Sequence, residues 1–466
     1  MKYDAVIIGA GPNGLSAAIT LARAGRKVAV YEASGGWGGG VSSLELTLPG
    51  FVHDVCSAVH PFAVSTPFFK SLPLEAFGLK WIYPDLPLVH PFTDGSAVKV
   101  ERSLEATCTG LGGDGEGYKN LIEPFVMGWD TLTAQVMAPF HFPRPSPVLF
   151  AFAWRSLRSA EGLAKAHLRT EHARALFAGF GAHSILPLNA LGSGAFALLM
   201  TASAHESGWP FPQGGAQKLS DALALYLRDL GGEIVTNRRI QDLNELPDAA
   251  SVLCDLTPKQ LLALGGTHLS DTFRHQLQKF RYGPAVFKID WALKAPIPWR
   301  NSTCAKAGTL HLGGFEEICN SEREVSAGRV GKRPFVILSQ PSLFDSSRAP
   351  APYHTAWAYI HVPNGCAQDF TSVIEDEIER YAPGFKTHIM KRSVWSPARL
   401  QEHNANLVGG DIGGGSNVWT QLLTRPTWRM YRTSNRRLYM CSASTPPGGG
   451  VHGLCGYYAA QDVLRD

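Results

Sequence analysis

The chain has 466 residues and nearly balanced charges, with 43 Lys and Arg against 39 Asp and Glu and a formal net charge of +4 at pH 7. A chain of this length exceeds one compact core, so we expect two or three domains. Its basic residues form no run or patch of the kind that binds nucleic acid, and we expect no such partner. The eight cysteines lie without C-x-x-C pairs or histidine partners, so no metal site and no disulfide framework is expected.

Residues 4–32 have the pattern of a complete dinucleotide-binding unit. An apolar strand pattern is followed by Gly9, Gly11, Pro12, Asn13 and Gly14, then by a helical pattern and a second strand. The first glycine allows a tight turn, the second allows backbone to approach a pyrophosphate, and the third allows the helix to pack on the strand. The N-terminus of that helix offers unpaired N–H groups to the phosphates. The segment therefore predicts a bound dinucleotide.

The choice between FAD and NAD depends on the residues after the second strand. Glu32 can accept hydrogen bonds from both ribose hydroxyls and would repel a 2′-phosphate, and Ala33 follows it. The chain then continues through a glycine-rich stretch that includes Gly39, Gly40 and Val41, where an NAD domain usually continues into a crossover helix. A bare backbone at this point suits a loop along the pyrophosphate and ribityl chain of FAD, although a flexible surface loop is the alternative. We therefore predict FAD.

The remaining pattern indicates an α/β protein with a discontinuous Rossmann-like FAD-binding domain. The segment 208–236 has paired glycines, an amphipathic helix and a strand, which indicates a return of the chain to the α/β domain. We assign residues 1–75, 206–283 and 404–466 to that domain. An inserted α+β substrate domain, with a mixed sheet and a helical part, is expected over residues 76–205 and 284–403, of which 130–205 is mainly helical and apolar.

Two segments bear on membranes. Residues 175–205 contain no Asp, Glu, Lys or Arg, but Pro187 and several glycines interrupt them, so we expect buried helices around an apolar cavity rather than a membrane span. Segment 139–160 is apolar and aromatic with arginines. It either packs in the core beside a proline-rich loop, which we favour, or contacts a membrane surface peripherally. The first strand pattern starts at Asp4 and leaves no room for a signal peptide, so we expect a cytoplasmic protein, with association at the membrane periphery as the open alternative.

The C-terminal segment has a strand pattern, a glycine loop and a helix. The loop glycines, 448–450, allow backbone to approach a planar ring closely, and the helix that starts near Gly453 directs its positive end toward whatever precedes it. Beside the pyrimidine side of a flavin, that end would stabilise the negative charge of the reduced ring. The alternative is a glycine turn that only caps a terminal helix.

Five stretches, in this order, resemble the phytoene desaturase-like branch of the FAD-dependent amine oxidase superfamily: GAGPNGL (9–15), residues 208–236, FKIDWAL (287–293), RPTW (425–428) and LYMCSASTPPGGGVHG (438–453). The resemblance covers essentially the whole chain and implies that the last stretch lies under the flavin, with Ser444, Gly450, Val451 and His452 at the cofactor. It also implies that a strand ending near Ile240 lies beside the adenine.

Two candidate catalytic residues follow from this resemblance. Amine oxidase relatives place a lysine on a strand like 285–293, where it holds a water near flavin N5, and Lys288 is similar in position; an exposed strand lysine is the alternative. Pro446 stands where relatives often have histidine. His452 stands at a position that is often apolar or proline in relatives, so it either faces the substrate side of the flavin or makes local hydrogen bonds.

The sequence thus predicts an FAD-dependent oxidoreductase that transfers a hydride from a hydrophobic small molecule to flavin N5. The apolar residues 175–205 and the aromatic residues 139–154 are the basis for a hydrophobic substrate. Three alternatives stay open: an amine oxidase with an aromatic cage formed by Tyr457, Tyr458 and Trp419, a redox-neutral polyene isomerase, and an FAD-loaded scaffold with little turnover. The electron acceptor (oxygen, a quinone or another protein) and the oligomeric state stay open too.

Overall fold

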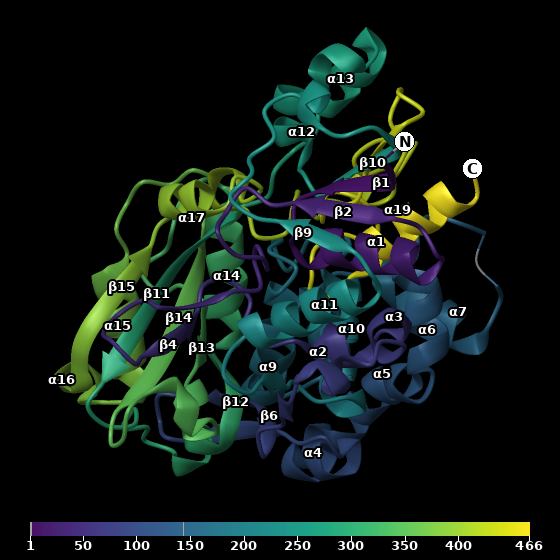
Figure 1. Cartoon of the computed structure of the whole chain (residues 1–466). Helices are drawn as coiled ribbons and strands as arrows, with labels where there is room; N and C mark the ends of the chain where they lie inside the picture. The colour runs from purple at the N-terminus through teal and green to yellow at the C-terminus, as the bar shows by residue number, and fades with distance from the viewer. Residues whose placement is uncertain (1, 143) are drawn as a thin grey trace.

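A five-stranded parallel sheet forms one half of the molecule (Figure 1). The computed structural model describes residues 2–142 and 144–466. The strands of this sheet come from three separate parts of the chain, in the order β16 (Leu438–Met440), β10 (Ala249–Cys254), β1 (Tyr3–Ile8), β2 (Val28–Tyr31) and β9 (Glu233–Val235). All neighbouring pairs are parallel. The sheet confirms the predicted Rossmann-like α/β class.

Helices cover both faces of this sheet because its strands are apolar on both sides. Ile7 and its neighbours on one face pack against α1 (Pro12–Arg23), α11 (Gln217–Asp229) and α19 (Leu454–Leu464). Ile8 and its neighbours on the other face pack against α12 (Pro258–Gly265) and α13 (Asp271–Gln278). The sheet is thus held between two helical layers, and only its strand ends face the rest of the molecule.

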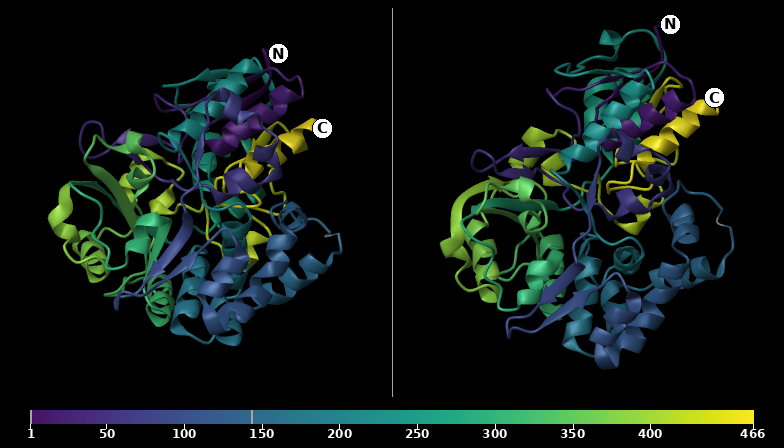
Figure 2. Two further views of the ribbon diagram at one scale, coloured as in Figure 1. Left: turned by 90° about the horizontal axis from the view of Figure 1, so that it is seen from below. Right: turned by 60° about the horizontal axis from the view of Figure 1, so that its bottom comes forward.

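The two ends of the chain meet in this half of the molecule, as all three views show (Figures 1 and 2). Helices α1 and α19 pack against each other. At the contact, a Cβ added to Gly456 would lie 1.8 Å from the carbonyl oxygen of Asn13. Only glycine therefore allows this close approach, which holds the C-terminal helix against the N-terminal dinucleotide turn.

A seven-stranded mixed sheet forms the second half. Its order is β15 (Ile389–Trp395), β11 (Ala285–Leu293), β14 (His354–Val362), β13 (Val336–Ser339), β12 (Ala307–Leu312), β6 (Leu86–Pro91) and β7 (Ala97–Val100). Every pair is antiparallel except β12 with β6. Phe287 and Ile289 on one face pack against α15 (Thr371–Tyr381) and α16 (Phe385–His388). The other face carries Lys288, and strand alternation places polar residues along it.

A group of helices packs beside this sheet: α4 (Leu104–Gly110), α5 (Gly115–Met127), α6 (Trp129–Val136), α7 (Pro147–Ser156), α8 (Ala160–His167), α9 (Glu171–Ala182), α10 (Ser193–Glu206) and α14 (Phe315–Ser326). Helices α9 and α10 are largely buried, as predicted for residues 175–205, and the chain breaks between them around Pro187. Within residues 2–142 and 144–466, no helix has both the length and the apolar composition needed to cross a bilayer.

The preference for core packing of segment 139–160 is wrong. Phe142 is 95% exposed and Trp154 75% exposed, and Phe140, Phe150 and Leu157 are exposed as well. Phe152 is buried, because α7 turns that residue toward α5, where it packs on Phe125. Helical periodicity places one face of α7 against the core and leaves the aromatic side chains of the other face in solvent.

Shorter elements connect these layers: β3 (Ser43–Glu45), β4 (Val52–Asp54), α2 (Pro61–Ser65), α3 (Pro67–Lys70), β5 (Trp81–Ile82), β8 (Phe211–Pro212), α17 (Pro397–His403) and α18 (Trp419–Leu422). Strands β3 and β4 pair with each other and carry the chain from the glycine-rich loop toward β11, where Lys288 Nζ donates to the carbonyl of Asp54. This connection brings the two halves of the molecule together.

Candidate functional site

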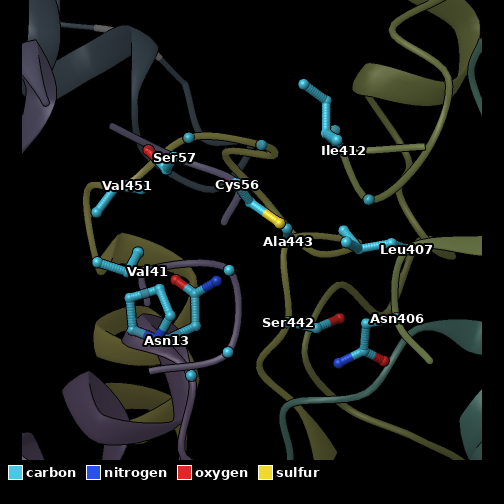
Figure 3. Close-up of a pocket in the computed structure, with 18 of the residues that line it drawn as sticks. Asn13, Val41, Cys56, Ser57, Asn406, Leu407, Ile412, Ser442, Ala443 and Val451 are labelled. Carbon is cyan, nitrogen blue, oxygen red and sulfur yellow. The ribbon is translucent and has the colours of Figure 1, made fainter. Parts of the chain in front are cut away.

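One cavity of about 1350 Å³ extends from the carboxyl ends of β1, β2 and β10 to the polar face of the second sheet. In open parallel sheets, the crevice beyond the carboxyl ends of the strands is where ligands bind. Figure 3 shows Asn13 and Val41 on one side of this cavity and Asn406 and Ser442 on the opposite side. The N-terminal turn and the segments 404–417 and 442–452 thus form two walls of one site.

The glycine turn has the geometry that its spacing predicts. Gly9 has a φ of 99° and donates its N–H to Tyr31 O at 2.8 Å, which closes the turn between strand and helix. Gly11, Pro12 and Asn13 line the cavity. Asn13 is buried, and its Oδ1 has no hydrogen-bond partner within the described chain. Because a buried polar atom without a partner is costly, this amide is suited to a polar ligand at the start of α1.

Gly14 does not line the cavity, and its role is in packing. A Cβ at this position would lie 2.0 Å from Gly9 O, so only glycine allows the helix to start this close to the turn. Its N–H donates to Asp255 Oδ2 at 3.0 Å. The predicted packing role of Gly14 agrees with this geometry, while direct contact with the cofactor is left to its neighbours.

Glu32 lies at the end of β2 and lines the cavity with Ala33. Its Oε2 accepts the N–H of Ala10 at 2.8 Å, and its Oε1 accepts the N–H of Ser34 at 2.9 Å. These bonds fix the carboxylate at the edge of the turn. A carboxylate held here has lone pairs for ribose hydroxyls, as the sequence predicts.

Two glycine-rich segments line the site, and Figure 3 shows Val41 and Val451 on the same side of it. Gly39, Gly40 and Val41 line it from the N-terminal part, and Gly450 and Val451 from the C-terminal part. A Cβ at Gly39 would lie 3.3 Å from the Cα of Gly11, so the loop lies directly over the turn. The bare backbone, the unpaired amide oxygen and the helix N-terminus together fit a pyrophosphate-linked cofactor.

One predicted cofactor contact, Ser444, and one predicted strand end, near Ile240, differ from the structure. Ser444 is fully buried behind the wall, where its Oγ donates to Gly414 O at 2.7 Å, and Ser442 and Ala443 line the cavity instead. Ile240 lines the cavity, but it ends no strand, because β9 ends at Val235 and an irregular segment follows. In both cases the local pattern predicts the right segment and only the tertiary structure decides which side chain faces inward.

His452 lines the cavity and is held by local hydrogen bonds. Its Nδ1 accepts the N–H of Leu454 at 3.0 Å, so the proton of the neutral ring is on Nε2, which lies 3.2 Å from Gly448 O. Burial lowers the pKa of His452 to about 4. The ring is therefore neutral at pH 7 and fixes the loop between the glycines and α19, which is the local alternative predicted for it.

Lys288 lies on the polar face of β11 and is buried, so the exposed alternative is wrong. Its ammonium group donates to Asp54 O at 2.9 Å and to both carboxylate oxygens of Asp290 at 2.6 Å. Three N–H bonds thus have protein partners, which leaves none for a bound water in this arrangement. Lys288 lines the cavity, and its water-holding role stays a prediction.

Asp255 is a functional residue that the sequence reasoning missed. It follows β10 directly, lines the cavity and lies against the glycine turn, where a Cβ on Gly11 would be 2.7 Å from its Oδ2. Burial raises the pKa of Asp255 to about 7, and the nearby Glu32 contributes in the same direction. The position of an acid directly after a buried parallel strand is the signal that could have identified it.

Arg425, in the stretch RPTW, is fully buried and was also missed as a site residue. Its guanidinium donates to the carbonyls of Ala443 at 2.8 Å and Gly414 at 3.0 Å. It therefore joins the segments 411–417 and 442–450, which form one wall of the site. Arginine suits this position because its donors spread in a plane and can reach several carbonyls.

The far end of the cavity is mainly apolar. Its lining includes Phe62, Leu149, Phe196, Leu199 and Met200. The predicted aromatic cage is not found there. Tyr457, Tyr458 and Trp419 do not line the cavity: Tyr457 packs on Phe68, with ring centroids 5.0 Å apart, and Trp419 is half exposed.

Comparisons with known proteins agree with this geometry. Residues 7–71 match the family of NAD(P)-binding Rossmann-like domains. The chain is 26% identical to pyridine nucleotide-disulfide oxidoreductase domain-containing protein 2 of Rattus norvegicus, over 100% of this chain and 94% of that protein. It is 25% identical to the neurosporene-forming phytoene desaturase of Rhodobacter capsulatus, over 97% of this chain and 92% of the relative. These relatives support the resemblance of the chain to the phytoene desaturase-like branch of the FAD-dependent amine oxidase superfamily.

The solved structure of putrescine oxidase bound to putrescine shares the fold of this phytoene desaturase-like chain. The two match with a TM-score of 0.63 and 18% identity, over 100% of both chains. The protein is an FAD-dependent oxidoreductase. Gly11, Asn13 and Glu32 would hold the dinucleotide part of FAD, and residues 449–452 line the same cavity.

Proposed function

We propose that this flavoprotein oxidises a hydrophobic small molecule by removing a hydride from a C–C or C–N unit. Bound FAD supplies the hydride acceptor at its N5 atom. The observation that carries the proposal is the continuity of the cavity, because one space joins the dinucleotide turn to the apolar lining formed by Phe62, Phe196 and Leu199. Apolar side chains from α10 and α2 hold an apolar substrate and exclude water from the reacting carbon.

Anaerobic mixing of the holoprotein with candidate substrates tests this proposal. Polyenes, amines and acyl lipids are each added while the visible absorbance of the flavin is followed, and bleaching by an apolar compound is expected. A Met200→Trp variant should fill the apolar part of the cavity and suppress bleaching, while FAD content stays the same. Full FAD occupancy with no bleaching by any compound would instead support a scaffold, and conversion that requires reduced flavin but consumes no electrons would support an isomerase.

The cofactor site has its own test. Glu32→Ala removes the acceptor for ribose hydroxyls together with the bonds to Ala10 and Ser34, and Gly11→Ala places a methyl group against Asp255. Both variants should lose bound FAD on purification. Glu233→Ala, which changes an exposed carboxylate of β9 that bonds Tyr3, serves as the control and should retain it. Retention of full FAD by the first two variants would contradict the assigned site.

We also infer a peripheral contact with a lipid surface. Phe142 directly follows residues 135–141, which line the cavity, and Phe150 and Trp154 are exposed on α7, whose Leu149 also lines it. An apolar substrate could then pass from lipid into the cavity without crossing water. Arg158, which is exposed in the same segment, is suited to anionic headgroups.

Vesicle sedimentation tests the lipid contact. Binding to vesicles of phosphatidylcholine with phosphatidylglycerol is expected, and Phe142→Ser combined with Trp154→Ser should weaken it at least about tenfold, because each aromatic side chain loses its transfer energy into lipid. Trp428→Ser is the matched control, since Trp428 is 72% exposed but lies outside this segment. Equal binding of all three proteins would refute the contact.

A further inference from the structure

Two polar side chains face the substrate end of the cavity without protein partners for their polar atoms. The first is Tyr359, on the polar face of β14. It is partly buried and lines the cavity. Its hydroxyl makes no hydrogen bond to any residue of the described chain, and protein atoms do not enclose it fully. In the sheet, Tyr359 lies beside Ile337 on one side and Lys288 on the other. The hydroxyl is therefore open to a ligand.

The second is His183, at the C-terminal end of α9. Its Nε2 lies 3.0 Å from the Nε2 of His311, a buried residue of β12. His183 lines the cavity and is partly buried. Its Nδ1 has no hydrogen-bond partner in the described chain, and, as with the hydroxyl of Tyr359, protein atoms do not enclose it fully. One ring nitrogen thus contacts protein and the other faces the cavity.

The proton positions of this histidine pair follow from His311. Its Nδ1 is buried and has no partner. A buried N–H without an acceptor is rarer and more costly than a buried lone pair, so the proton of His311 is on Nε2 and is donated to His183. His183, which accepts at Nε2, must then carry its own proton on Nδ1. The pair therefore directs an N–H donor into the cavity.

Both groups are neutral at pH 7. Burial lowers the pKa of His183 to about 3, with a smaller contribution from His361, and burial raises the pKa of Tyr359. Neither is suited to proton transfer at neutral pH, because an efficient acid or base has a pKa near the working pH. Their chemistry is that of hydrogen-bond donors.

The positions of the carboxylates restrict the charge that a ligand can carry at this end of the cavity. Among the described lining residues, the carboxylates are Glu32 and Asp255, both at the dinucleotide end. The buried carboxylates near this face are already paired, Asp290 with Lys288 and Glu322 with His361. A substrate ammonium group would thus be desolvated at the far end without a counter-ion, which is costly. A neutral oxygen would instead meet these two donors, and Thr309 and Trp357 of the same sheet face also line the cavity.

We propose that the substrate carries a neutral oxygen, as a carbonyl or hydroxyl group on an apolar body, and that Tyr359 and His183 bind this oxygen. The proposal rests on the proposed oxidation of a hydrophobic molecule at this site and specifies its substrate class. His311 and Tyr359 lie two strands apart, so their backbones are separated by about 10 Å. Tyr359 and His183 both line the cavity, as do Phe196, Leu199 and Met200 of α10.

A matched set of probes tests the inference on the holoprotein. Hexylbenzene, hexanophenone and the primary amine that corresponds to the ketone have nearly the same shape and differ in one group. Binding of each is measured by calorimetry, which does not depend on turnover. The ketone should bind about 3- to 10-fold more tightly than the hydrocarbon for each hydrogen bond it gains, and the amine most weakly.

Two variants assign the preference to the residues. Tyr359→Phe and His183→Phe should each lower the affinity for hexanophenone by about 3- to 10-fold and leave that for hexylbenzene unchanged. Tyr457→Phe is the matched control, because Tyr457 does not line the cavity, and it should change neither affinity. Equal affinities for ketone and hydrocarbon, tightest binding of the amine, no binding of any probe, or an unchanged preference in both variants would overturn the proposal.

Failure of this inference is distinct from failure of the proposed function. Flavin bleaching by an apolar substrate in the wild-type protein, combined with no preference for the ketone, would retain the oxidase chemistry and reject the oxygen site. Ketone preference without bleaching by any compound would retain the oxygen site and reject the proposed oxidation.

Discussion

We expect Asp255 to make both folding and FAD binding depend on pH. Its pKa of about 7 in the folded chain compares with about 3.9 for an aspartate in an unfolded chain. Between these values the folded state holds a proton that the unfolded state has lost, so the free energy of unfolding falls as pH rises from about 4 to about 7. The full difference corresponds to at most about 4 kcal/mol. Above about pH 7, stability no longer changes through this group.

The same carboxyl group lies beside the turn that would hold the pyrophosphate. An ionised Asp255 would repel the negative charge of the pyrophosphate, so FAD binding should require protonated Asp255. With a pKa of about 7 in the apoprotein, the affinity for FAD should fall about tenfold between pH 6 and pH 8. Asp255→Asn keeps an oxygen that can accept the N–H of Gly14 but cannot ionise, and it should abolish this dependence.

The assay is a titration of the apoprotein with FAD, followed by flavin fluorescence, together with thermal unfolding over the same pH range. Asp271→Asn, in which the changed side chain is 90% exposed, is the control and should behave as wild type. If wild type and Asp255→Asn bind FAD with the same pH dependence, Asp255 does not titrate beside the pyrophosphate, and the reasoning from its burial is refuted.

Three further predictions concern packing and buried charge. Gly456→Ala should lower thermal stability by about 1–3 kcal/mol or more, since its methyl group would meet the backbone of Asn13; an unchanged melting temperature would contradict the close helix contact. Arg425→Gln leaves carbonyls of the segments 413–414 and 443–444 unpaired, which should lower the free energy of unfolding by about 1–3 kcal/mol for each carbonyl. The variant should also retain less FAD, whereas the control Arg429→Gln, at an exposed arginine, should retain it fully. Lys288→Met removes the ammonium partner of the buried Asp290, leaving His53 Nδ1 at 3.6 Å, and should cost about 3–5 kcal/mol in urea unfolding. The double variant with Asp290→Leu should recover part of this loss, and equal stability of single and double variants would show that the ion pair is not coupled.

Much of the cofactor half of the molecule could be predicted from local pattern. The turn at Gly9, the helix after it and the acid at Glu32 follow each other within one short segment, so their spacing alone sets their geometry. The same holds for the strand 285–293, whose alternation places Lys288 and Asp290 on one face. These features depend on neighbours in sequence, which the sequence specifies directly.

Side-chain direction outside regular elements could not be predicted in this way. Ser444 and Ile240 lie in irregular segments, where no period links sequence position to a face. Ser444 is buried behind the cavity wall, whereas Ile240 lines the cavity. The aromatic residues of segment 139–160 have the composition of a core, but among those of α7 only Phe152 is buried, while Phe150 and Trp154 are exposed. Burial of an apolar side chain depends on what packs against it, which is a long-range property.

The sequence by itself determined the dinucleotide unit, the α/β class and FAD, because each is encoded by spacing within a few tens of residues. The tertiary structure decided the rest of the site. It brought Asp255 to the glycine turn, placed Gly456 against Asn13 across more than four hundred positions, and combined His183, His311 and Tyr359 from separate elements at one end of the cavity. Contacts of this kind depend on the packing of whole helices and sheets, so no local pattern contains them.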